Sequence, residues 1–172
     1  HPLVRQNTRP AAQAAPKAQP SASADAENAP IMALMQKLQS NPNDVEALLQ
    51  LAGLFAERGD NDAAKEMAQR AVVAAPNETQ PLYMLGIIQH SQNRNAEAAA
   101  SLEKVVAARE DPSVRYSLGI LYAYYLEQPD KGLEQLQKAL DNPNTPADLK
   151  KAVAEEVTKI KEHKNHTPQQ AQ

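Results

Sequence analysis

Apolar and small residues recur through the middle of the chain at intervals of 34 residues. The sets that show this spacing most clearly are Ala71, Val105 and Ala139; Ala64, Ala98 and Gly132; and, with steps of 34 and 33, Leu51, Leu85 and Leu118. A fixed period of this length is typical of a solenoid, in which each repeat is one supersecondary unit stacked on its neighbours. The period therefore predicts thin stacked layers and not one thick core.

A helical stripe of apolar residues opens the repeats. In the first repeat it consists of Leu48, Leu51, Ala52 and Phe55, and in the second of Leu82, Leu85, Gly86 and Gln89. These positions stand at i, i+3, i+4 and i+7, which places them on one face of a helix. The small residues Ala52, Gly86 and Gly119 predict close approach of the two helices of each unit.

Polar residues predict where several helices begin. Asn43 followed by Glu46 has the spacing of a capping box. Asp111 and Thr145 each stand before a proline, a pattern that predicts an N-cap followed by proline in the first helical position.

The residue types at these spacings resemble the tetratricopeptide repeat family over residues 42 to about 144. The matching positions are Leu48, Leu51, Ala52, Phe55, Gly59, Ala64, Ala71 and Pro76 in the first unit; Leu82, Leu85, Gly86, Ala98, Leu102 and Val105 in the second; and Leu118, Gly119, Tyr122, Leu136 and Ala139 in the third. The resemblance implies an all-α fold, a right-handed α-α superhelix of three repeats.

The sequence departs from the family pattern at several places. Ala68, Gln89 and Arg115 stand where the family carries large apolar or aromatic residues. The connection between the second and third units is one residue short. One extra residue lies between Tyr122 and Gly132, and we expect it in a turn because helix faces cannot slip in a stacked solenoid.

One helix is predicted on each side of the repeats. Residues 30–39 form a leading half-repeat helix, and a C-terminal capping helix follows the third unit. Their apolar stripes are Ile31, Leu34, Met35 and Leu38, and Leu149, Val153, Val157 and Ile160. The predicted organisation is a disordered Ala/Pro-rich linker over 1–29, the repeat domain over 30–164 and a disordered tail over 165–172.

The composition of the chain disfavours several classes of function. Aromatic residues reach only 3% and the 18 Lys and Arg are interspersed with 21 Asp and Glu, which does not resemble a nucleic-acid-binding surface. No apolar run is long enough to span a membrane. Cysteine is absent, which excludes disulfides and thiol catalysis. His163 and His166 lack a third metal ligand, and no catalytic motif is present, so we expect no enzyme activity, metal or cofactor.

The N-terminal segment bears on location. The chain begins with His1 and continues with an Ala/Pro/Gln-rich stretch that resembles tethers following a signal anchor in bacterial envelope proteins. We therefore expect a processed or partial chain tethered in the bacterial periplasm or envelope, with a cytoplasmic protein as the alternative.

Tetratricopeptide arrays bind peptides in a concave groove lined by the first helix of each unit, so the resemblance implies the same here. Spacing away from the packing stripe selects the candidate groove residues Leu49, Gln50, Gly53, Tyr83, Met84, Ile87, His90, Tyr116, Ser117, Ile120 and Tyr124. Many of them are apolar or aromatic, which favours an amphipathic helix or an apolar peptide as partner. Ile87 and Ile120 could instead pack against a neighbouring repeat, and Tyr122 is expected in the core. Tyr125 could lie in either place.

A different groove chemistry is disfavoured. The family's co-chaperones hold a C-terminal carboxylate with cationic side chains at positions that here carry Leu49, Gly53, Met84, Ser113 and Ser117. The repeats thus offer no cation for a carboxylate.

The sequence therefore predicts a non-catalytic scaffold that binds a protein or peptide in its groove. The tether, the lone helix and three units together also resemble the periplasmic tetratricopeptide domain of bacterial cytochrome c maturation proteins, which implies capture of the C-terminal helix of an apocytochrome. One alternative is a self-assembling scaffold or an envelope assembly factor in pilus or outer-membrane biogenesis, for which oligomers are expected. Another is an accessory domain of a larger enzyme.

Overall fold

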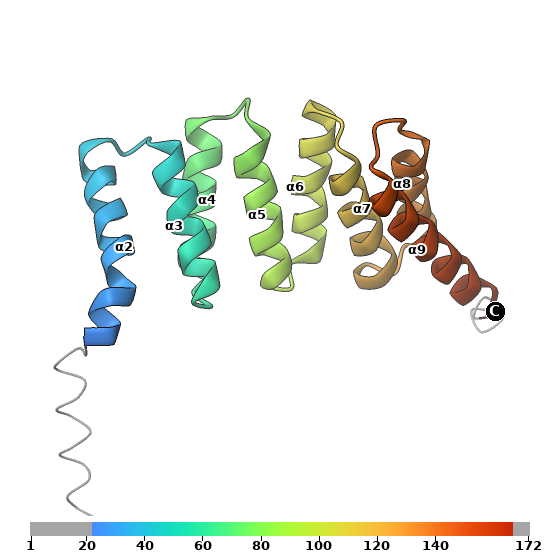
Figure 1. Cartoon of the computed structure of the whole chain (residues 1–172), viewed down its shortest axis with the longest axis horizontal. Helices are drawn as coiled ribbons and strands as arrows, with labels where there is room; N and C mark the ends of the chain where they lie inside the picture. Colours follow the sequence, from blue (N-terminus) through green and yellow to red (C-terminus); the bar gives the residue numbers. More distant parts are fainter. Residues whose placement is uncertain (1–21, 167–172) are drawn as a thin grey trace, which may run out of the picture.

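The computed structural model describes residues 22–166, and within that range every regular element is helical. The helices lie side by side in one row and in chain order, with α2 at one end and α9 at the other (Figure 1). The elements are α2 (Ala22–Ser40), α3 (Val45–Glu57), α4 (Asn61–Ala74), α5 (Thr79–Ser91), α6 (Asn95–Ala108), α7 (Pro112–Ile120), the π-helical turn η1 (Leu121–Tyr125), α8 (Pro129–Asp141) and α9 (Ala147–His166). None of these helices has the length and apolar character needed to cross a bilayer.

Three helix pairs form the repeats, as predicted: α3 with α4, α5 with α6, and α7–η1 with α8. The residues of the 34-residue period lie between the paired helices. Ala64, Ala71 and Ala98 are fully buried there. The all-α superhelix with three repeats is therefore confirmed.

Glycines allow close contact between the helices of the third pair. A Cβ on Gly119 would stand 2.5 Å from Cδ2 of Leu136, and a Cβ on Gly132 would stand 2.8 Å from the Gly119 carbonyl oxygen. The corresponding distance from Gly86 to Cδ2 of Leu102 is 3.0 Å. The small residues thus permit close helix contact, as expected from the sequence.

The extra residue of the third unit lies inside a helix, so its predicted place in a turn is wrong. The first helix of that unit ends in η1, where the Leu126 N–H donates to the Leu121 carbonyl at 3.0 Å, five residues back. A π turn accommodates one additional residue while the rest of the helix keeps its contacts. The missing residue does lie in a connection, because three residues separate α6 from α7 where four separate α4 from α5.

The helix starts follow the predictions in part. Asp111 accepts a hydrogen bond from the Ser113 N–H at 3.0 Å and precedes a first-turn proline, as predicted. The N-cap of α3 is Asp44 and not Asn43, since the Asp44 carboxylate accepts from a backbone N–H of the first turn. Thr145 is no N-cap, because its buried hydroxyl donates to the Ala139 carbonyl at 2.6 Å and so closes the end of α8.

The leading helix is longer than predicted. It begins at Ala22, within the stretch expected to be linker, and Pro30 lies inside it with an exposed side chain. Ile31, Leu34 and Leu38 face the first repeat and are buried. Met35 is exposed, which corrects its place in the predicted stripe. The rest of the predicted linker, residues 1–21, lies outside the described residues.

Two positions of α2 differ from the corresponding positions of α4, one repeat later. Ala64 and Ala71 of α4 face α3, and the positions 34 residues earlier hold Pro30 and Lys37. Lys37 is exposed and too long for the close approach that Ala71 allows. On its other face, α2 covers the first repeat through its buried apolar residues.

The trailing helix caps the other end as predicted. Val153 and Ile160 of α9 are buried against Leu136 and Ala139 of α8. The helix runs to His166, two residues into the predicted tail, and residues 167–172 lie outside the described range.

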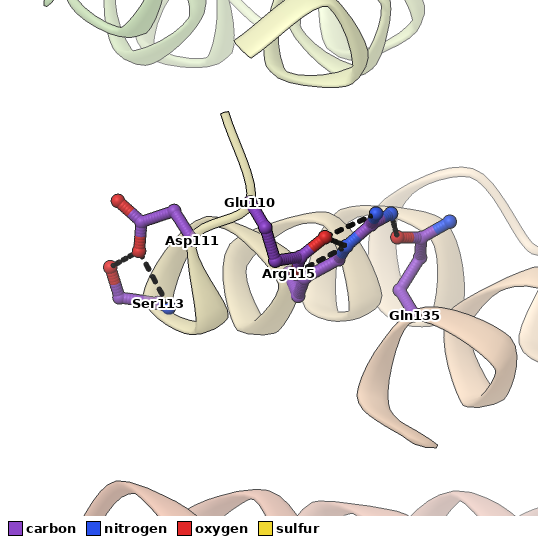
Figure 2. A network of polar contacts seen from close by, with 5 residues as sticks. All are labelled: Glu110, Asp111, Ser113, Arg115 and Gln135. Atoms are coloured by element: carbon purple, nitrogen blue, oxygen red, sulfur yellow. Dashed lines mark hydrogen bonds and ion pairs between the residues drawn. The ribbon is translucent and has the colours of Figure 1, made fainter. Parts of the chain in front are cut away.

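Two departures from the repeat pattern are satisfied by hydrogen bonds. Buried Gln89 accepts a hydrogen bond from the Ser101 hydroxyl at 2.7 Å. Arg115 donates to both carboxylate oxygens of Glu110 and, at 2.8 Å, to Oε1 of Gln135 on α8 (Figure 2). The hydrogen bonds that Glu110 accepts from Arg115, together with the positive charge of Arg115, hold the pKa of Glu110 below its usual range.

Candidate functional site

A cavity of about 410 Å³ opens on the face built by the first helices of the second and third repeats, next to the C-terminal cap. Helices α5 and α7, the turn η1 and helix α9 all contribute to it. Its lining residues are Ile87, His90, Tyr116, Ser117, Ile120, Leu121, Tyr124, Tyr125 and Glu156.

Six of the eleven predicted groove residues meet in this cavity. They are Ile87, His90, Tyr116, Ser117, Ile120 and Tyr124. Ile87, Tyr124 and Tyr125 are 40%, 49% and 51% exposed, although all three are large side chains with much apolar surface. Tyr116 is shared between the cavity and the core, since it also packs against the cluster around Leu136. Tyr122 is buried in the core, as expected.

The other five predicted residues lie elsewhere. Leu49 is only 8% exposed, so its predicted exposure is wrong: it packs in one cluster with Ile31, Leu34 and Leu38 of α2. The sequence pattern did not reveal this contact because it does not show that α2 covers this face of α3. Met84 is half-buried between the first two repeats. Gln50, Gly53 and Tyr83 do not line the cavity.

Sequence reasoning did not assign three of the lining residues, Leu121, Tyr125 and Glu156. The first two belong to η1, and the π turn brings Tyr124 and Tyr125 together at the cavity. The extra residue before Gly132 was the signal for this local change. Glu156 lies three residues after buried Val153, at the edge of the packing stripe of the capping helix.

A short hydrogen bond joins the turn η1 to the cap. The Tyr124 hydroxyl donates to Oε1 of Glu156 at 2.7 Å. Partial burial, and to a lesser degree the Glu156 carboxylate, raise the pKa of Tyr124 to about 12. The phenol therefore remains a hydrogen-bond donor at neutral pH. The exposed Lys159, one helical turn further along α9, has its Nζ 3.7 Å from the other carboxylate oxygen.

His90 is held by two neighbours. Its Nδ1 lies 2.7 Å from Oδ1 of Asn95, and because that oxygen can only accept, Nδ1 carries the proton. The ring centroids of His90 and Tyr125 are 4.7 Å apart at 80°, an edge-to-face contact. The α5 and η1 walls of the cavity are therefore fixed relative to each other.

A second cavity of about 610 Å³ adjoins the first and shares Tyr124 with it. Its lining includes Glu127, Lys159, His163 and Lys164. The capping helix α9 thus supplies, beside the groove, the cations that the first helices of the repeats lack. Lys164 pairs with Asp130 and Lys159 with Glu156. Within residues 22–166, no three histidine or carboxylate side chains gather in a way that could hold a metal ion.

The stacked helix pairs and the groove on their first helices define a tetratricopeptide repeat protein. Residues 18–109, slightly more than half of the chain, match the family model of the ChAPs, the Chs5p-Arf1p-binding proteins. The chain belongs to this family.

Solved structures with the same fold include MamA and YrrB. One MamA structure superposes with a TM-score of 0.62 at 21% identity, covering 81% of this chain and 89% of that one. MamA from Desulfovibrio magneticus RS-1 is 30% identical, with a TM-score of 0.59 and coverage of 77% and 82%. YrrB, described as a TPR protein with an unusual peptide-binding site, is 22% identical, with a TM-score of 0.58 and coverage of 68% and 60%.

A curated relative is similar over a shorter stretch. The photosystem I assembly protein Ycf3 of Acaryochloris marina (strain MBIC 11017) is 35% identical over 68 residues, which are 39% of this chain and 41% of that protein. The match thus spans less than half of the relative's length.

Proposed function

We propose that this chain is a non-catalytic scaffold and that its groove binds the apolar face of an amphipathic helix or an extended apolar peptide. The observation that carries the proposal is the 410 Å³ cavity, on which Ile87, Tyr124 and Tyr125 leave apolar surface exposed. Exposed apolar surface gathered in one concavity is typical of an interaction site.

The size of the cavity suits one or two anchoring side chains. Burying one Leu or Phe side chain contributes roughly 1.5–3 kcal/mol, so a single anchor gives weak binding. A bound helix presents further anchors at i+3, i+4 and i+7, and these can continue along the groove toward the second cavity. The proposal therefore predicts a partner segment of several turns and not an isolated side chain.

The comparisons support a role in binding or assembly without identifying the partner. YrrB is described by its peptide-binding site, and Ycf3 is a photosystem I assembly protein. As the finer proposal, the partner is the C-terminal helix of an apocytochrome c in the bacterial envelope. This proposal rests on the resemblance of the chain's layout to cytochrome c maturation proteins.

The test compares two substitutions of exposed branched apolar residues. Ile87→Asp introduces a charge into the cavity, whereas Val73→Asp introduces the same charge on α4, where Val73 is 80% exposed and lines no cavity described above. Wild type and both variants are immobilised to capture partners from envelope and cytosolic extracts. A synthetic C-terminal helix of an apocytochrome c is titrated separately.

The proposal expects capture by wild type and Val73→Asp, and at least about tenfold weaker binding by Ile87→Asp, since a carboxylate in an apolar site is costly. Equal capture by the two variants would refute the assignment of the groove. Failure of the apocytochrome helix to bind wild type would remove the cytochrome c proposal alone.

A second candidate function is self-assembly through the end of the stack. Met32 and Met35 of α2 are exposed, and Met35 lines a cavity of about 370 Å³ whose lining is mainly apolar. The lining residues are Met35, Leu38, Gln39, Leu51, Phe55, Ala63, Met67 and Arg70. Sedimentation velocity over a hundredfold range of concentration, with Met35→Asp as the variant, tests for oligomers that this face forms.

A further inference from the structure

The charge in the 410 Å³ cavity is one-sided. Glu156 is the one Asp or Glu among the lining residues, and no Lys or Arg lines the cavity. Its carboxylate side chain is only 19% exposed, and one oxygen already accepts from the Tyr124 hydroxyl. A peptide that buries this carboxylate without a cationic partner would lose the hydration of a charge, which is costly.

Apart from Ser117, the other polar residues that line the cavity are aromatic. Tyr116, Tyr124 and Tyr125 line it together with the His90 ring. The faces of such rings attract the ammonium of Lys and the guanidinium of Arg, and the guanidinium also stacks on them. A carboxylate among electron-rich rings is thus complementary to a cation on an aliphatic stem, and Ile87 and Ile120 offer contacts to that stem.

We propose that this cavity binds a Lys or Arg side chain of the partner peptide, with Glu156 as its counter-ion. The inference rests on the proposed function of the groove and adds the chemistry of the partner: an amphipathic segment in which a basic residue stands beside the apolar anchors. This polarity is opposite to that of a groove that holds a carboxylate.

Lys159 does not fill this role within the chain. It lies 3.7 Å from Oε2 of Glu156, its side chain is exposed, and it lines the adjoining cavity and not this one. Because the lysine is well exposed, this i, i+3 pair contributes little, and a ligand cation can compete with it. Lys159→Met should accordingly strengthen cation binding about twofold or more, because it removes the competing charge.

The experiment titrates the ¹⁵N-labelled chain with three small probes and follows the amide shifts of Ile87, Ser117 and Ile120. The probes are n-butylguanidinium, neutral pentan-1-ol and pentanoate, which share an apolar stem and differ in charge. The variants are Glu156→Gln, which keeps an acceptor for the Tyr124 hydroxyl, and Glu155→Gln. Glu155 is the adjacent, exposed residue, so the second variant removes the same charge without touching the cavity.

The proposal expects butylguanidinium to bind wild type at least about fivefold more tightly than pentan-1-ol, and pentanoate to bind weakest. Glu156→Gln should abolish the advantage of the cation, whereas Glu155→Gln should leave it. Equal losses in the two variants would overturn the proposal, because they would show only the net charge of the chain. If pentan-1-ol binds as tightly as the cation, the charge assignment is wrong but the apolar groove stands. If no probe shifts these amides, both proposals fail.

Discussion

Substituting alanine at three helical glycines measures how closely the paired helices pack. Gly53, Gly86 and Gly119 occupy the first helices of successive repeats, and an added methyl group meets a different environment at each. At Gly53 no atom lies within 4 Å of the new Cβ. At Gly86 the Leu102 side chain lies at 3.0 Å, and at Gly119 the Leu136 side chain lies at 2.5 Å.

The expected free energies of unfolding follow from two opposing effects. Replacing Gly by Ala within a helix stabilises it by about 0.8–1 kcal/mol. At Gly53 only this gain operates. At Gly119, fully buried Leu136 must move into packed neighbours, and such overpacking costs about 1–3 kcal/mol. We therefore expect Gly53→Ala to stabilise by about 0.8 kcal/mol, Gly86→Ala to be near neutral and Gly119→Ala to destabilise by up to about 2 kcal/mol.

Urea unfolding followed by circular dichroism measures this series, with the slope checked for each variant because a repeat array can unfold in stages. The distinctive result is the order of stability, Gly53→Ala above Gly86→Ala above Gly119→Ala. A Gly119→Ala variant as stable as Gly53→Ala would refute the reasoning, since it would mean that α7 and α8 are not held at this distance.

Three further substitutions test local features. Gly59→Ala, at a φ of +80° and with open space around the new Cβ, should cost about 1 kcal/mol through backbone strain alone, as measured by urea unfolding. Arg115→Met should change the free energy of unfolding by less than about 1 kcal/mol, whereas Glu110→Ala should be more destabilising because it leaves the guanidinium without its carboxylate. The reverse order would contradict the polar contacts shown in Figure 2. Burial and the nearby Glu103 carboxylate raise the pKa of Tyr122, so stability should be full below the ordinary tyrosine pKa of ~10 and fall as pH rises above it, and Tyr122→Phe should flatten this alkaline loss in melts between pH 8 and 11.

The repeat pattern was sufficient to predict the fold because the same residue types recur wherever two helices must touch. Ala64 and Ala98 face the paired helix of their units, and Gly119 contacts Leu136 across the third pair. Such positions tolerate few residues, so they leave a strong periodic signal in a single sequence. The helix ends were harder to predict, because Asn43 and Asp44 can both cap and only the local backbone geometry selects between them.

The candidate site was predictable only where it repeats this pattern. Ile87 and Ile120 lie on corresponding first helices, and spacing alone assigned them to one face. Leu49 occupies an equivalent face, but α2 covers it. The leading helix α2 was predicted from the sequence, but the face of α3 that it covers depends on how α2 packs. The periodicity of the sequence carries no information on this packing.

The most informative part of the cavity arises where the repeat is broken. The extra residue is absorbed by η1, which brings Tyr124 and Tyr125 to the cavity, and the capping helix then places Glu156 against the Tyr124 hydroxyl. A regular third repeat would lack the π turn and its extra residue, so Tyr124 and Tyr125 would not both lie at the cavity. The repeats thus supply most of the apolar lining of the groove, and the capping helix α9 supplies its charge. Substitutions in α9 should therefore alter partner choice, whereas substitutions in α5 should alter the affinity for any apolar segment.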